Sequence, residues 1–168
     1  METYASGCRA LRSAYAEPAA ETFHKWRKRT KYHRQHTRLL RDLRRPITRG
    51  WQMEVAALSD LLGSEHDLAL FRATLLDKGL ALAGDRDQRA LLALIDQRGT
   101  GLRSQARPLG ERIFAEKPRQ LVRRFGKYWK IWHCSWEGAE SFRFLPKGVR
   151  AASALVWPDN GSEVSWAN

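Results

Sequence analysis

The sequence has few of the features that mark a secreted or membrane protein. Its 168 residues contain two cysteines, Cys8 and Cys134, which lie far apart. Two isolated cysteines make neither a disulfide framework nor a zinc-ligand pattern and fit a reducing compartment, so we predict a cytoplasmic location. No apolar run reaches the ~18 residues that a transmembrane helix needs, and the first residues lack the regions of a secretory signal, so we expect no membrane partner.

The motifs of common enzymes are also missing. The sequence contains no GxxxxGK[ST] phosphate loop, no GxGxxG after a strand and no GxSxG. A metal site built from His24, Glu65, His66 and Asp67 is conceivable, but no HxxxH or HExxH pair supports it. The basic region also lacks the clustered carboxylates of a two-metal phosphohydrolase. We therefore expect no catalytic residues, no cofactor and no bound metal.

Acidic residues are scarce, with 18 Asp and Glu against 30 Lys and Arg, a net charge of +12. Residues 24–49 hold eleven of the basic residues and one acid, Asp42, which makes +10 in this segment alone. Such an excess predicts a polyanionic partner, whether nucleic acid, an anionic membrane or a phosphate polymer.

Strand patterns are absent as well, because no window alternates between apolar and polar residues and no Asn-Gly turn joins two such windows. Helical spacing of apolar residues and the positions of Pro and Gly predict four main helices, joined by short connections into an all-α, antiparallel four-helix bundle. The expected helices cover residues 19–45, 48–78, 85 to about 113 with a kink or break near Arg107, and 118–136. We assign residues 1–18 to the remnant of a preceding helix, 19–136 to the bundle and 137–168 to an irregular tail.

One face of the first expected bundle helix concentrates the basic residues. At 100° per residue a single stripe, here called the basic stripe, contains His24, Arg27, Lys28, Lys31, Gln35 and Arg38, and its margin holds Arg34, Arg41 and Arg45. The opposite face holds Trp26, Thr30, His33, Thr37 and Leu40, where His33 is expected to be a core histidine with its hydrogen bonds satisfied. Like charges four residues apart repel, so the stripe is typical either of a solvated face or of a surface that meets an anion with regularly spaced charges; the near absence of interleaved acids favours binding.

A second basic row occupies the last expected helix, at Arg119, Arg123, Lys127 and Lys130. By itself it fits an ordinary amphipathic helix. If it faced the same groove as the basic stripe, Arg123 and Lys127 would add a second wall to an anion-binding channel.

Helix-turn-helix DNA binding is the main competing interpretation, but the stripe helix is long and ends at a proline, and it lacks Asn, a residue that reads adenine in DNA.

Two segments resemble a known family. Residues 23–31, FHKWRKRTK, resemble the H-x-x-R-K-x-x-K signature of the CHAD domain, the conserved histidine α-helical domain, and residues 58–68, LSDLLGSEHDL, resemble its L-x-x-L-L-G-x-x-H-D-L signature. Residues 114–118 are similar to a weaker later block. The resemblance covers about residues 5–132.

The resemblance implies two pseudo-symmetric four-helix bundles that bind inorganic polyphosphate in a basic groove, without established catalysis. It places His24, Arg27, Lys28, Lys31 and His66 on the phosphate, and helical phase adds Arg34 and Arg38. The chain corresponds to the second bundle only, so a second copy or a separately encoded first half is a candidate partner. The alternatives are a substrate-holding accessory to a CYTH-type triphosphatase, and nonspecific nucleic-acid binding, which we do not expect.

Overall fold

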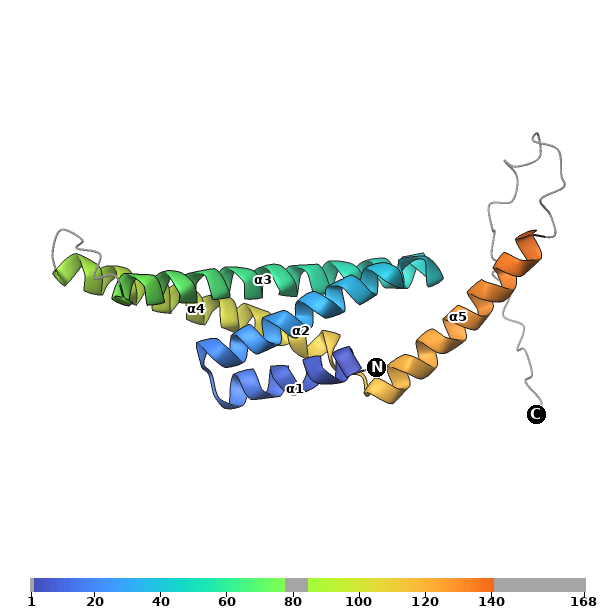
Figure 1. Cartoon of the computed structure of the whole chain (residues 1–168), viewed down its shortest axis with the longest axis horizontal. Helices are drawn as coiled ribbons and strands as arrows, with labels where there is room; N and C mark the ends of the chain where they lie inside the picture. Colours follow the sequence, from blue (N-terminus) through green and yellow to red (C-terminus); the bar gives the residue numbers. More distant parts are fainter. Residues whose placement is uncertain (1, 78–84, 141–168) are drawn as a thin grey trace, which may run out of the picture. The chain divides into compact units, whose positions relative to one another are not determined.

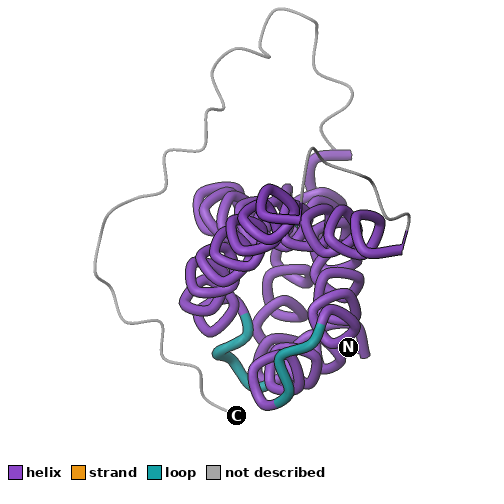
Figure 2. Tube along the Cα trace, turned by 90° about the vertical axis from the view of Figure 1, so that its left-hand side faces the viewer, coloured by secondary structure: helices purple, strands orange, loops and turns teal. Residues whose placement is uncertain are grey.

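The computed structural model describes residues 2–77 and 85–140, which form five α helices and a short 3-10 helix, with no strand among them (Figures 1 and 2). The elements in order are α1 Glu2–Ala16, α2 Ala20–Leu39, η1 Arg41–Leu43, α3 Arg45–Asp77, α4 Asp85–Ile113 and α5 Pro118–Glu140. The predicted all-α class is confirmed. None of the described helices combines the length and the apolarity that crossing a bilayer requires.

Helices α1 to α4 pack as an antiparallel bundle. Between α2 and α3, His24 meets His66 while Arg34, further along α2, meets Asp60, so the two helices run in opposite directions. Between α3 and α4, Glu65 pairs with Arg103 and Glu54 with Arg112. Helix α1 closes the bundle against α4, where the Tyr4 hydroxyl donates to the Ile113 carbonyl oxygen and the Tyr15 hydroxyl to that of Arg103.

The core lies where α2 crosses close to α4. Trp26 is fully buried, and a Cβ added to Gly110 of α4 would lie 2.5 Å from its Cζ2 atom. Gly7 of α1 has the same relation to Phe114, at 2.5 Å from Cε1. Contacts this short leave no room for a side chain, so these two glycines make space for the Trp26 and Phe114 rings. Leu121 and Phe125 of α5 join the same core.

The first helix belongs to this bundle, which the sequence did not indicate. Tyr4, Cys8 and Ala14 of α1 are buried in the core together with Trp26. We assigned residues 1–18 to the remnant of a preceding helix and residues 19–136 to the bundle. In the structure α1 is one of the four antiparallel helices. The predicted domain boundaries, after residues 18 and 136, are not tested by this packing and stay a prediction.

The corner between α2 and α3 differs from the expected one. The helix predicted for residues 19–45 ends at Leu39, and η1 follows before α3 begins at Arg45. Pro46 therefore lies in the first turn of α3, where its missing N–H costs nothing, instead of ending the previous helix. Thr48 is buried inside α3, and its one hydroxyl hydrogen is shared between the carbonyl oxygens of Arg41 (2.7 Å) and Arg44 (2.9 Å). These bonds hold the corner together.

The C-terminal elements follow the prediction in part. We expected a kink or a break near Arg107; α4 continues through Pro108 to Ile113, so the break is wrong, and the kink stays a prediction. Pro118 opens α5 as predicted, but this helix runs to Glu140, so the first residues of the expected irregular tail are helical. The rest of that tail, residues 141–168, lies outside the described residues.

Candidate functional site

Helix α2 buries one face and exposes the basic stripe on the other. Phe23, Trp26 and Thr30 are buried, as are His33 and Thr37, because these positions recur every three or four residues and face the bundle core. In the basic stripe Arg27 is half-buried and the other members are exposed: His24, Lys28, Lys31, Gln35 and Arg38. The helical phase predicted from the sequence is therefore the observed one.

The structure brings the two signature histidines together. His24 of α2 and His66 of α3 lie with their Nδ1 atoms 3.4 Å apart and their ring centroids 4.7 Å apart. The pKa of His66 lies below its usual value, first because of partial burial and then because of the positive charges of Arg27 and His24. The nearby carboxylates of Asp67 and Glu65 oppose this shift. A negatively charged ligand at this end of α2 would favour the protonated rings.

Most cations of the basic stripe have no carboxylate partner among the described residues. The acids near α2 pair elsewhere: Glu21 with Lys25, and Asp42 with Arg41 and Arg45. Arg34, predicted at the margin of the stripe, is different, because its Nη1 atom lies 2.8 Å from Oδ1 of Asp60 on α3. The unneutralised charge is therefore concentrated at Arg27, Lys28, Lys31 and Arg38.

The predicted second wall does not meet this surface. Leu121 and Phe125 bury one side of α5 in the core, and Arg123 and Lys127 lie on the opposite side of that helix, both exposed. No contact in the described part of the chain joins either residue to α2. The row is regular in sequence, but helical phase directs it away from the core that α5 shares with α2.

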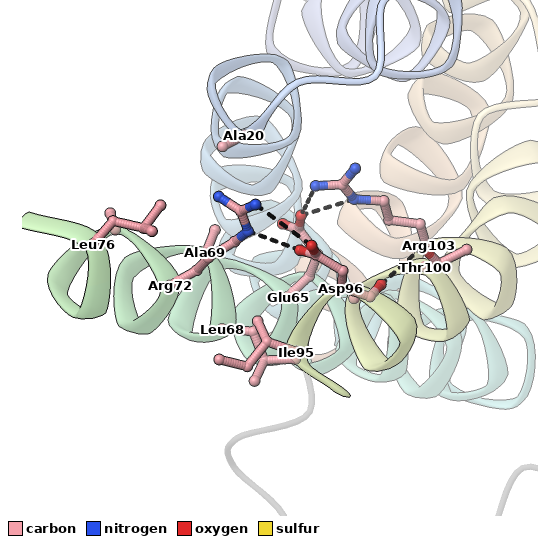
Figure 3. A pocket seen from close by; sticks show the side chains of 12 residues that line it. Ala20, Glu65, Leu68, Ala69, Arg72, Leu76, Ile95, Asp96, Thr100 and Arg103 are labelled. Atoms are coloured by element: carbon pink, nitrogen blue, oxygen red, sulfur yellow. Dashed lines mark hydrogen bonds and ion pairs between the residues drawn. The ribbon is translucent and has the colours of Figure 1, made fainter. Parts of the chain in front are cut away.

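A cavity of about 410 Å³ lies on the other flank of α3, between α3 and α4 near the start of α2 (Figure 3). Two ion pairs cross it: Glu65 with Arg103 at 2.6 Å, and Arg72 with Asp96 at 2.8 Å. The Glu65 side chain is 4% exposed, and the Arg103 guanidinium also lies 4.5 Å from the centre of the Phe23 ring. Because its charges are paired internally, this cavity offers little attraction to a polyanion.

Sequence reasoning missed the pairing of Glu65. We considered Glu65 with His66 for a metal site, but neighbouring positions on a helix point about 100° apart. Glu65 turns to Arg103 on α4 and His66 to α2. In the described residues no group of three His, Cys, Asp or Glu side chains is placed to hold a metal ion. The available signal for its burial was the helical spacing of four and then three residues that leads from Leu58 through Leu62 to Glu65.

The core histidine is buried as expected but not hydrogen-bonded as expected. His33 is 3% exposed and lies among the rings of Tyr4, Trp51 and Phe114. Its Nε2 atom has no hydrogen-bond partner, which corrects the prediction of a satisfied histidine. Burial, and to a smaller extent the charge of His36, lowers the pKa of His33 to about 4. The ring is therefore neutral near pH 7.

Comparison with known proteins gives one family. The family model of the CHAD domain matches residues 1–76. No curated protein and no solved structure matches the chain. The matched segment runs from α1 to the last turn of α3 and includes the basic stripe, both signature histidines and the α2–α3 corner. The resemblance predicted from the two signatures is confirmed over residues 1–76, which are similar to the CHAD domain family.

Proposed function

We propose that the exposed surface of α2 binds inorganic polyphosphate and that the protein is a binding module without catalysis of its own. The observation that carries the proposal is the set of cations on one exposed helix face without carboxylate partners among the described residues, beside the His24–His66 pair. A rigid row of cations suits a linear polyanion, because Arg and Lys form charge-assisted hydrogen bonds to phosphate oxygens. The match to the CHAD domain family is consistent with this ligand.

The central experiment replaces Arg27, Lys28 and Lys31 together by Ala. These side chains lie away from buried Trp26, so helix content measured by circular dichroism should stay unchanged. Affinity for long-chain polyphosphate, measured by calorimetry at fixed salt, should fall at least tenfold, or about 1.4 kcal/mol. A matched control replaces Arg86, Arg98 and Lys117, which are exposed on other parts of the chain, and removes the same charge. Equal binding by the two triple variants contradicts the proposal.

Nucleic acid is the competing ligand, because any cationic helix attracts it. Competition between long-chain polyphosphate and duplex DNA at one ionic strength separates the two. We expect polyphosphate to displace DNA, while DNA at equal phosphate concentration leaves bound polyphosphate in place. The reverse order would assign the surface to nucleic acid. A role as substrate-holding partner of a CYTH-type triphosphatase would use the same surface and is tested by whether hydrolysis by that enzyme accelerates when this protein is added.

A further inference from the structure

We propose that the polyphosphate site continues past the end of α2 and terminates in a cavity lined by arginines at the α2–α3 corner. The bound chain would then be held along a fixed length, from the His24–His66 pair at one end to Arg41, Arg45 and Arg49 at the other. This inference rests on the proposed function and adds to it a second anchoring point and a length requirement.

Helix α3 supplies the wall opposite the basic stripe. Alternating steps of four and three residues define one row on α3: Arg45, Arg49, Gln52, Ala56, Ser59, Gly63 and His66. Residues at this spacing share one side of a helix. Two contacts show that this side adjoins α2, since the Gln52 Nε2 atom donates to the Thr37 carbonyl oxygen at 2.6 Å and His66 meets His24. We call this row together with His24, Arg27, Lys31, Arg34 and Arg38 the α2–α3 track.

In the middle of the α2–α3 track, the residues that α3 contributes have small side chains. Ala56, Ser59 and Gly63 are small, and a Cβ added to Gly63 would meet no heavy atom within 4 Å. The glycine therefore makes no space for a neighbouring side chain, unlike Gly110. On the α2 side of the track, Lys31 and Arg38 are both exposed.

The corner end of the track is hollow and basic. A cavity of about 650 Å³ is lined by Arg41, Arg45, Pro46, Arg49 and Gln52. Asp42 is the one carboxylate paired with these arginines, contacting Arg41 at 3.4 Å and Arg45 at 3.1 Å. Arg49 has no ion-pair partner among the described residues. Three guanidinium groups against one exposed carboxylate leave a net positive cavity, and the guanidinium fork matches phosphate oxygens.

The two ends set a length for the ligand. From His24 to Leu39 at the end of α2 the chain advances 15 positions, which at the helical rise is about 22 Å, and Arg41 follows in η1. Tripolyphosphate spans only part of this distance and can occupy one end. A long polyphosphate reaches both ends, and the second contact then forms at the high effective concentration of a tethered group.

The test compares two ligands and two variants of the full chain. The corner variant carries Arg41→Gln, Arg45→Gln and Arg49→Gln, and the control variant carries Arg86→Gln, Arg98→Gln and Lys117→Gln. Calorimetry at fixed salt measures the affinity of each protein for tripolyphosphate and for long-chain polyphosphate. We expect the corner variant to lose at least tenfold affinity for the long chain relative to the control variant, with its salt dependence reduced by about two ions.

The outcomes separate the two proposals. If the unchanged protein binds long-chain polyphosphate and the corner and control variants bind it equally, the corner does not anchor the ligand and the inference is overturned, while the proposed function stands. If the unchanged protein binds neither ligand, the proposed function fails and the inference fails with it. Loss of long-chain affinity in the corner variant alone supports both.

A second pair of variants tests the track without touching its arginines. Gly63→Asp places a carboxylate in the middle of the α2–α3 track, and Gly63→Asn places a side chain of the same shape without charge. Neither has a steric conflict, because the Cβ position is open. Long-chain affinity should fall about tenfold for Gly63→Asp relative to Gly63→Asn. Equal affinity of this pair would show that the phosphate chain does not pass between α2 and α3.

Discussion

The two flanks of α3 differ in whether their charged side chains form ion pairs. Toward α4 its acids and bases find partners, and the Glu65–Arg103 and Arg72–Asp96 pairs neutralise the cavity between the helices. Toward α2 a single cross-helix pair, Arg34–Asp60, stands beside a row of cations without carboxylate partners in the described residues. The comparison shows that a basic side chain is a binding candidate only where the fold leaves its charge unmatched.

The largest expected effect is on the paired flank. Arg103→Ala should lower the free energy of unfolding by about 3 kcal/mol, because it leaves the buried Glu65 carboxylate without its partner. Arg72→Ala removes an exposed pair of the same cavity and should cost less than about 1 kcal/mol. Urea unfolding of the two variants measures the difference. Polyphosphate affinity should be the same in both variants. A loss of affinity in either would show that the α4-facing flank of α3 also takes part in binding.

The next effect concerns His33, the neutral histidine buried in the core. The unfolded chain protonates His33 below its ordinary pKa of 6.5, whereas the folded protein does so only near 4. Stability is therefore full above pH 6.5 and falls as the pH drops toward 4, by about 2 kcal/mol at pH 5 and about 3 kcal/mol in total. Urea unfolding at several pH values checks this. His33→Leu should flatten the profile between pH 6.5 and 5, and an unchanged slope in that variant would assign the acid sensitivity to other groups.

A smaller effect should appear at the histidine end of the open flank. Protonated rings attract a polyanion, and the pKa of His66 lies below its ordinary value of 6.5, so polyphosphate affinity should rise as the pH falls below 6.5. We expect a gain of about fivefold between pH 7.5 and 5.5. Calorimetry on the double variant His24→Gln, His66→Gln should give a flat profile. A gain that persists in the double variant would remove the histidine pair from the site.

The smallest effect tests the single pair on the open flank. Asp60→Asn removes the carboxylate that holds Arg34 and adds one net charge beside the α2–α3 track. Long-chain polyphosphate affinity should rise about threefold, because an exposed pair contributes under ~1 kcal/mol. Asp96→Asn makes the same change of charge on the paired flank and should leave affinity unchanged. An equal rise in both variants would mean that net charge, not position, governs binding.

Much of this arrangement could be predicted from particular residues. The periodic burial of Trp26, Thr30 and His33 fixed which side of α2 is exposed, and the two signature segments indicated that His24 and His66 serve one site. The sequence did not indicate where α2 ends, since nothing local distinguishes a helix that stops at Leu39 from one that runs to Pro46. Nor did it separate the functions of Glu65 and His66, which depend on two different neighbouring helices.

The sequence by itself determined the all-α class, the basic face of α2 and the excess of charge in residues 24–49, because helical period and composition are local properties. Only the tertiary structure decided which of these basic side chains form ion pairs with a carboxylate. Ion pairing joins residues far apart in the chain, such as Arg34 with Asp60 and Arg103 with Glu65, so it depends on which helices become neighbours. The packing of α1 into the bundle and the cavity at the α2–α3 corner have the same origin.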